Sequence, residues 1–252
     1  MAQGDYCQTG LSLSFINNAT GWALCVVEDG GPDMQKVLYQ TTDGGKQWSV
    51  IAASGTTTKG ALPLAGAASG IRFVSAEQGW MGYISEACPA EVWETSDGGH
   101  TWNAEVLSGS GTNAAFPCST STPLFANGEG LLVSGGQTAT SVYEYSDSAP
   151  RWVQARTLPD TVGEVAALSA NVLLGVKKSG HEAFPHDPLL SEDGGQTWTP
   201  FTLPSGVSVS GGADLVSSSD LWTVATLNTQ SLLLHGIRAN GMWTWQTSSL
   251  PE

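Results

Sequence analysis

The sequence predicts an all-β protein, a β-propeller of five blades that each contain four antiparallel strands. A short pattern that ends in tryptophan recurs five times along the 252 residues. Its closing tryptophans lie 46 to 54 residues apart, close to the length of a four-stranded propeller blade. The chain is also rich in glycine (31 residues) and poor in charge (13%), as is typical of many short strands joined by tight turns. The closing residues are Trp48, Trp102, Trp152, Trp198 and Trp245.

Each repeat unit opens with a predicted β-hairpin. In residues 11–27 and 70–84, an alternating run, a polar turn and a second alternating run follow one another. Alternation of apolar and polar residues with a period of two indicates half-buried strands. Weaker copies of this pattern occupy residues 121–136, 165–178 and 213–227, so each of the five units gains two strands.

A third and a fourth strand flank a recurring turn and complete each unit. The third run precedes the turn, as at residues 36–42, and the fourth follows it, as at residues 47–52. Residues 54–69 and 108–122 are rich in Gly, Ser, Thr and Pro and are predicted to be loops. We therefore expect one domain over residues 1–252, with blades at approximately 10–53, 66–108, 116–158, 162–204 and 207–250.

The recurring turn has the form S/T-x-D-x-G-x-T-W. It reads TTDGGKQW at 41–48, TSDGGHTW at 95–102 and SEDGGQTW at 191–198, with decayed copies YSDSAPRW at 145–152 and GIRANGMWTW at 236–245. The Asp can accept backbone N–H groups within the turn, the glycines allow positive φ, and the Trp packs on the blade. These residues are therefore predicted to be structural rather than catalytic: Asp43, Gly45, Trp48, Asp97, Gly99, Trp102, Asp193, Gly195 and Trp198.

The turns resemble those of the Asp-box, or bacterial neuraminidase repeat, β-propellers. The fuller pattern, F-V-x-x-x-x-G-W followed by T-x-D-G-G-x-T-W, is similar to that of photosystem II stability and assembly factor-like proteins. The resemblance implies a propeller with Asp-box hairpins. It does not imply one activity, because the superfamily includes sialidases, xyloglucan-active hydrolases, sorting receptors and assembly factors. It also implies that ligands bind at the face opposite the Asp boxes.

The charge of the chain excludes several partners. Twenty-three acidic residues against 9 basic ones give a net charge of −14, which argues against nucleic acid and against an anionic membrane surface. No stretch approaches the roughly 20 apolar residues of a transmembrane helix, so membrane insertion is not expected. The N-terminal residues have no basic or apolar region and do not form a signal peptide. We expect a monomer.

Four cysteines suggest an oxidising compartment. Cys7, Cys25, Cys88 and Cys118 contain no C-x-x-C spacing, so neither a zinc site nor a redox motif is indicated. An even number of cysteines in a lysine-poor β protein suits an exported protein with two disulfides. The favoured pairs are Cys7–Cys25 and Cys88–Cys118, with buried free thiols as the alternative. We therefore expect an extracellular, periplasmic or cell-surface location.

The charged residues contain no recognisable catalytic set. A sialidase site needs three arginines around the substrate carboxylate, and the chain has only Arg72, Arg151, Arg156 and Arg238, of which Arg151 lies in a decayed box. A glycosidase needs two facing carboxylates. Eight acidic residues fall on the predicted ligand-face loops, where solvated side chains are the alternative interpretation: Glu28, Asp29, Asp33, Glu86, Glu91, Asp160, Glu182 and Asp187.

Two loops are rich in potential metal ligands. Residues 177–187 contain two histidines and two acids, but their spacing matches no zinc motif. Residues 28–33 are rich in oxygen ligands but lack the alternation of a calcium loop. We therefore predict no cofactor, no metal and no catalytic residue. The ligand-face candidates are Glu28, Asp33, Glu86, Glu91, His181, Glu182, His186 and Asp187.

Two functions remain open from the sequence. The first is a non-enzymatic binding or scaffolding propeller, protein-binding and assembly-factor-like. The second is a carbohydrate-active protein, a glycoside hydrolase or lectin, with a ligand site in the central funnel. Trp93, Trp222 and Trp243 lie outside the box set and would stack sugar rings if exposed or pack the blades if buried.

Overall fold

The computed structural model divides into two compact units, Met1–Thr157 and Leu158–Glu252, and each is described by itself. The single-domain expectation stays a prediction. The structure describes residues 10–27, 34–55, 61–85, 89–109, 118–126, 129–135, 140–148, 150–160, 162–167, 169, 171–177, 188–200, 202–217, 220–227, 230–240 and 242–249.

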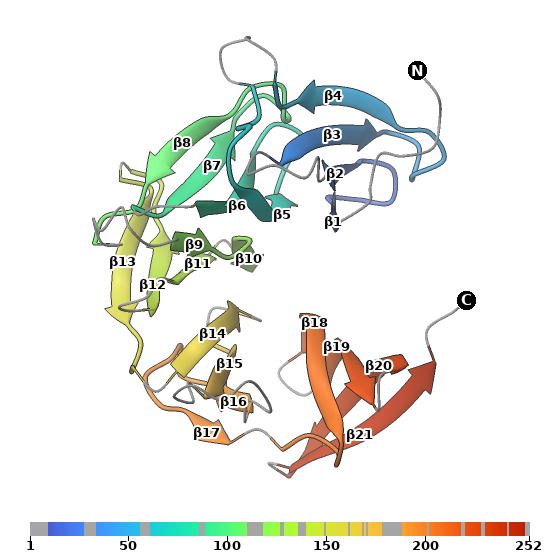
Figure 1. Cartoon of the computed structure of the whole chain (residues 1–252), viewed down its shortest axis with the longest axis vertical. Helices are drawn as coiled ribbons and strands as arrows, with labels where there is room; N and C mark the ends of the chain where they lie inside the picture. Colours follow the sequence, from blue (N-terminus) through green and yellow to red (C-terminus); the bar gives the residue numbers. More distant parts are fainter. Residues whose placement is uncertain are drawn as a thin grey trace. The chain divides into compact units, whose positions relative to one another are not determined.

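The predicted all-β class is confirmed, because the described elements are 21 β-strands in antiparallel sheets (Figure 1). No helix among these residues has the length and apolar character needed to cross a membrane. The strands form five meanders of four strands each. The number of blades in a closed propeller stays a prediction.

The first unit contains meanders 1 to 3. Meander 1 is one sheet, and meanders 2 and 3 share a nine-stranded sheet with β9. The strands of meander 1 are β1 (Gly10–Phe15), β2 (Gly21–Val27), β3 (Gln35–Thr41) and β4 (Ser49–Ala53). Those of meander 2 are β5 (Ala67–Phe73), β6 (Gly79–Ser85), β7 (Glu91–Thr95) and β8 (Asn103–Val106). Those of meander 3 are β10 (Leu124–Ala126), β11 (Glu129–Gly135), β12 (Thr140–Tyr145) and β13 (Trp152–Thr157).

The second unit contains meanders 4 and 5, which are separate four-stranded sheets. The strands of meander 4 are β14 (Val162–Ala167), β15 (Leu173–Lys177), β16 (Pro188–Ser191) and β17 (Thr199–Pro200). Those of meander 5 are β18 (Val207–Ser217), β19 (Asp220–Leu227), β20 (Gln230–Ala239) and β21 (Met242–Ser249).

Strand β9 (Cys118–Thr120) corrects the expectation that residues 108–122 form only a loop. Ser119 pairs with Ile84 of β6 and with Gly135 of β11, so this strand joins meanders 2 and 3 into one sheet. A strand of three residues is too short to show an alternating pattern, which is why the sequence did not reveal it.

A glycine lies opposite a phenylalanine in the opening hairpin of each meander of the first unit. The pairs are Phe15 with Gly21, Phe73 with Gly79, and Phe125 with Gly130. In each pair the ring occupies the space that a glycine side chain would take, since a Cβ on Gly79 would lie 2.6 Å from the Phe73 ring. The F-x-x-x-x-x-G-W spacing therefore records a cross-strand packing contact.

Tryptophans stack between successive meanders of the first unit. At the first interface, formed by Trp22, Phe73 and Trp102, the Trp22 ring stacks on Phe73 with centroids 3.9 Å apart and planes at 4°. The Trp22 indole donates to the carbonyl of Gly98 at 2.9 Å. At the second interface, formed by Trp80, Phe125 and Trp152, Trp80 stacks on Phe125 at 4.3 Å. The first tryptophan of one meander thus packs on the next meander.

The Asp box is a closed set of hydrogen bonds within its turn. In meander 2 the Thr95 hydroxyl donates to Asp97 at 2.9 Å and accepts the N–H of Gly99 at 2.9 Å. Asp97 also accepts the backbone N–H and the hydroxyl of Thr101, at 2.8 and 2.6 Å. The indole of Trp102 donates to the carbonyl of Gly99 at 3.0 Å. The boxes of Asp43 and Asp193 repeat this arrangement, except that Gln47 of the first box has no hydroxyl group to donate, and the paired glycines of all three have positive φ.

The box carboxylates titrate below their usual range. Hydrogen bonds from Gln47 and Thr41 lower the pKa of Asp43, and those from the Thr197 hydroxyl and backbone lower the pKa of Asp193. For Asp97, burial opposes the shift, but hydrogen bonds from Thr101 and Thr95 still lower the pKa. Hydrogen bonds to a carboxylate favour its ionised form. The hydrogen bonds that lower these pKa values thus come from within the turns.

Both described cysteines are buried, Cys25 in β2 and Cys118 in β9. Both are disulfide-bonded, and no cysteine in the described part of the chain is free. Cys7 and Cys88 lie outside the described residues, so the predicted pairing stays a prediction.

Replacement of Gly79 by alanine should destabilise the protein. The new methyl group would collide with the Phe73 ring, and overpacking of this kind costs about 1–3 kcal/mol. Urea denaturation gives the free energy of unfolding. Gly135→Ala is the matched control, since a Cβ there meets only the Ser119 hydroxyl at 3.3 Å. Equal losses in the two variants would contradict the packing role.

Acid should weaken the Asp boxes in a defined direction. Because the pKa of each box Asp is lower in the folded chain than in the unfolded chain, its contribution is complete above about pH 4 and is lost as pH falls through the folded pKa. Asp193→Asn should lower stability at neutral pH and flatten this acid dependence. Asp147→Asn, in the decayed box, is the control. The urea midpoint is measured between about pH 2 and pH 7. If it depends on pH in the same way in the wild type and in Asp193→Asn, the box carboxylate does not stabilise the fold as described.

Candidate functional site

Most of the predicted ligand-face residues fall in segments that the structure does not describe. Glu28, Asp33, Glu86, His181, Glu182, His186 and Asp187 lie outside the described residues, so their grouping stays a prediction. Glu91 is described. It begins β7 and is half-buried, and its carbonyl accepts the hydroxyl of Thr120 at 2.8 Å. In the described part, no three His, Cys, Asp or Glu side chains form a group that could hold a metal.

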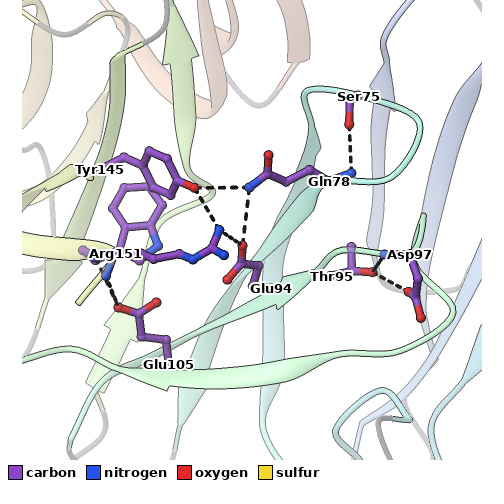
Figure 2. Close-up of polar contacts among 9 residues, drawn as sticks. Ser75, Gln78, Glu94, Thr95, Asp97, Glu105, Tyr145 and Arg151 are labelled. Atoms are coloured by element: carbon purple, nitrogen blue, oxygen red, sulfur yellow. Dashed lines mark hydrogen bonds and ion pairs between the residues drawn. The ribbon is translucent and has the colours of Figure 1, made fainter. Parts of the chain in front are cut away.

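A polar cluster lies instead at the second interface, where meanders 2 and 3 meet. It contains Gln78, Glu94, Glu105, Tyr145 and Arg151, and we call it the Arg151 cluster (Figure 2). Meander 2 supplies the amide and both carboxylates, and meander 3 supplies the phenol and the guanidinium.

Local structure fixes the three residues from meander 2. Gln78 ends the turn between β5 and β6, where the Ser75 hydroxyl accepts its backbone N–H at 3.0 Å. Glu94 lies in β7, and Glu105 lies in β8 opposite Val92. Val92 and Glu94 are two residues apart on one strand, so Glu94 and Glu105 share a face of the sheet. The pleat therefore brings both carboxylates to one side.

The Arg151 side chain connects the two meanders. Its Nη1 donates to Glu94 Oε1 at 2.7 Å and to the Tyr145 hydroxyl at 3.0 Å. The Gln78 amide donates to the same two acceptors, at 3.4 and 3.2 Å. Figure 2 shows these four groups as a ring of contacts across the interface.

In the third turn, Glu105 accepts the backbone N–H that the Asp accepts in an intact box. In the intact boxes the Asp accepts the backbone N–H of the residue before the closing tryptophan, namely Gln47, Thr101 or Thr197. In the decayed box that residue is Arg151, and its N–H donates to Glu105 of meander 2 at 2.9 Å. The Trp152 N–H donates to the same oxygen at 3.2 Å. A carboxylate from the neighbouring meander thus caps the third turn.

An aromatic group underlies the cluster. The Tyr145 ring meets the rings of Trp80 and Trp152 edge to face, each with centroids 5.4 Å apart. Trp80 and Trp152 are each 1% exposed, and neither indole N–H has an acceptor in the described structure. A buried donor without a partner costs about 1–3 kcal/mol. At the first interface, by contrast, the indoles of Trp22 and Trp102 both donate to glycine carbonyls.

Burial and charge shift the titration of the cluster. Burial raises the pKa of Glu94, although the Arg151 guanidinium opposes this. A hydrogen bond with Tyr145 and the nearby carboxylates raise the pKa of Arg151 despite burial, so its charge is permanent. The cluster holds two carboxyl groups against one guanidinium.

In the sequence, Arg151 was considered only as a candidate for a sialidase arginine triad, and its place in a decayed box argued against that role. A stronger signal lay in how the third box departs from the other two boxes of the first unit. Tyr145 stands where those boxes have Thr41 and Thr95, and Arg151 stands where they have Gln47 and Thr101. Sequence comparison does not identify Glu105, because the strand register alone brings this residue to the turn.

The remaining tryptophans of interest are half-buried. Trp93 lies 6.0 Å from the Tyr83 ring, Trp222 stacks on His235 at 3.8 Å, and Trp243 stacks on Trp245 at 5.7 Å. Each has an aromatic partner within its own unit, which favours packing over sugar stacking.

Comparison with solved structures identifies the fold. A GH74 enzyme from Niastella koreensis matches with a TM-score of 0.52 and 13% identity, covering 94% of this chain and 46% of the enzyme. A fucose-specific lectin from Aleuria aurantia matches with a TM-score of 0.51 and 12% identity, covering 96% of this chain and 79% of the lectin. YCF48 bound to a D1 peptide matches with a TM-score of 0.41 and 17% identity, covering 91% of this chain and 93% of YCF48.

No protein-family model matches the chain, and no curated protein sequence matches it. The chain is thus an all-β protein of the β-propeller class, with a fold similar to that of the GH74 enzyme and the lectin. It spans about half the length of the GH74 enzyme. Identities this low show the fold and say nothing about ligand or reaction.

Removal of the Glu105 carboxylate should destabilise the first unit. Glu105→Ala leaves the N–H groups of Arg151 and Trp152 without their acceptor, at a cost of about 1–3 kcal/mol. Glu105→Gln keeps an acceptor oxygen and should lose less stability than Glu105→Ala. Glu144→Ala, which removes a surface ion pair with Arg156, should cost below about 1 kcal/mol. Urea denaturation gives the free energy of unfolding of each variant. If Glu105→Ala is no less stable than Glu144→Ala, the capping role is wrong.

Proposed function

We propose that this chain is a non-enzymatic binding or scaffolding β-propeller that holds a protein partner, as an assembly factor does. The observation that carries the proposal is the state of the two carboxylates in the Arg151 cluster. Glu94 accepts from Arg151 and Gln78, and Glu105 accepts two backbone N–H groups. Both acids are held by internal donors, an arrangement that opposes their use as a catalytic acid and base.

Hydrolysis of a glycoside needs a different arrangement. One carboxyl group must deliver a proton and a second must act from the opposite side of the bond, with the substrate between them. In the cluster Arg151 bonds to both acids, through its side chain to Glu94 and through its backbone to Glu105. Release of Glu105 would leave two N–H groups without their acceptor. Glu105 could act in hydrolysis only if it lost the hydrogen bonds that hold the third turn.

We propose that the partner binds at the loops between the second and third strands. In the first unit, the box turns and the cluster lie at the other end of the strands, since Glu91 begins β7 and the box residue Thr95 ends it. We therefore place recognition of the protein partner at the opposite end. The net charge of −14 favours a partner with a basic surface.

Charge reversal tests the proposal. Once a partner is purified, the variant Glu28→Lys, Asp33→Lys and Glu86→Lys, with all three changes in loops of the first unit, should bind it at least about tenfold more weakly by calorimetry. The matched control reverses three exposed acids of the same unit outside those loops, Glu77, Glu144 and Asp147, with the same change in net charge. Equal loss in both variants would show a general charge effect and defeat the proposed location.

A carbohydrate-active enzyme is the second candidate, and one observation favours it. Burial raises the pKa of Glu94 beside Glu105, and carboxyl groups in unlike environments are the usual acid and base of glycosidases. The fold is shared with both a lectin and a GH74 enzyme, so it does not decide between binding and hydrolysis. Reducing-sugar release from soluble polysaccharides that Glu94→Gln abolishes would replace the binding proposal.

We also propose that the protein works in an oxidising compartment outside the cytoplasm. The disulfide-bonded state of Cys25 and Cys118 supports this. Non-reducing peptide mapping of the native protein tests it, since unmodified thiols at these two positions would contradict the proposal.

A further inference from the structure

We propose that the Arg151 cluster is a carbohydrate-binding site, in which Arg151 and the two glutamates bind neighbouring hydroxyl groups of one neutral sugar ring. The site is separate from the loops assigned to a protein partner and goes beyond the proposed function. Its members come from two meanders and meet at the second interface (Figure 2).

The Arg151 guanidinium has N–H donors that make no hydrogen bond within the described structure. Arginine carries five N–H donors, and the bonds to Glu94 and Tyr145 use only those on Nη1. Nε and Nη2 make no hydrogen bond in the described structure, and the side chain is 40% exposed. A planar fork with free donors is therefore presented to solvent, held in place by its own ion pair.

The carboxylates supply matching acceptors. The bonds that hold Glu94 and Glu105 all end on Oε1, so Oε2 of each group makes no hydrogen bond among the described residues. A hydroxyl group is both a donor and an acceptor. Two adjacent hydroxyls of a sugar can accept from the Arg151 fork while they donate to glutamate oxygens, and charge-assisted bonds of this kind are the stronger ones.

Charge favours a neutral ligand. The cluster has two carboxyl groups and one guanidinium, and the whole chain carries −14, so an anionic ligand would meet like charge. A cationic group offers donors only, so it would leave the N–H groups of Arg151 without acceptors. A polyhydroxyl ligand without charge satisfies both the donors and the acceptors.

The second interface also departs from the plan of the first. Where Trp22 and Trp102 donate to the carbonyls of Gly98 and Gly99, Trp80 and Trp152 have no acceptor in the described structure, and charged groups occupy the edge of the interface. A departure that leaves polar groups unsatisfied is expected at a site kept for function. Tyr145, packed against both indoles, gives the site a rigid aromatic base.

Tryptophan fluorescence of the whole chain, backed by calorimetry, tests the proposal with galactose, mannose, fucose, xylose and N-acetylglucosamine. At least one sugar should bind saturably below about 50 mM. Affinity should fall about tenfold in Arg151→Lys, which loses the planar fork, and in Glu94→Gln. Arg156→Lys, in the same meander but paired with Glu144, should bind like the wild type. Urea midpoints confirm that each variant is folded.

Several outcomes would overturn the site. No saturation with any of these sugars, or affinity unchanged in Arg151→Lys, would remove it. Tighter binding of a basic peptide than of every neutral sugar would assign the cluster to protein recognition instead. These results are independent of the loop charge reversals, which test the protein partner at the other end of the strands.

Discussion

The stack of Trp22 on Phe73 packs the first two meanders against each other, beside hydrogen bonds from β5 to Ser12 and Ser14 of β1. It requires a glycine opposite each phenylalanine, because the ring fills the space above the neighbouring strand. It also places the Trp22 indole against the Asp-box turn of meander 2, where Gly98 accepts its N–H. The glycine–tryptophan pair and the Asp box, separate in sequence, are thus two halves of one interface.

The box turn can serve this purpose because it is rigid by itself. Thr95 and Asp97 satisfy the turn's own N–H groups, and the two glycines take positive φ, so the carbonyls of Gly98 and Gly99 are fixed and point at indoles. The turn requires the ionised form of Asp97, which accepts the hydroxyl of Thr95 and both the hydroxyl and the backbone N–H of Thr101.

The second interface shows the structural consequences of a decayed box. The Tyr145 hydroxyl, in place of a threonine, lies in the Arg151 cluster, and Glu105 of the neighbouring meander caps the turn that no longer caps itself. Packing is kept through Trp80 and Phe125, but two indole N–H groups have no acceptor in the described structure. The candidate site therefore lies where the third box has lost its own hydrogen bonds and Glu105 and Arg151 join the two meanders instead.

The sequence by itself determined the all-β class, the meanders and the turn chemistry of Asp43, Asp97 and Asp193, because alternation and turn formation act over a few neighbouring residues. It could not show β9, which is too short to alternate, nor that Trp22 and Trp80 pack on the following meander. The Arg151 cluster was decided only by tertiary structure. Its carboxylates and guanidinium are 46 or more residues apart in the chain, and only strand register and the stacking of meanders bring them within hydrogen-bonding distance.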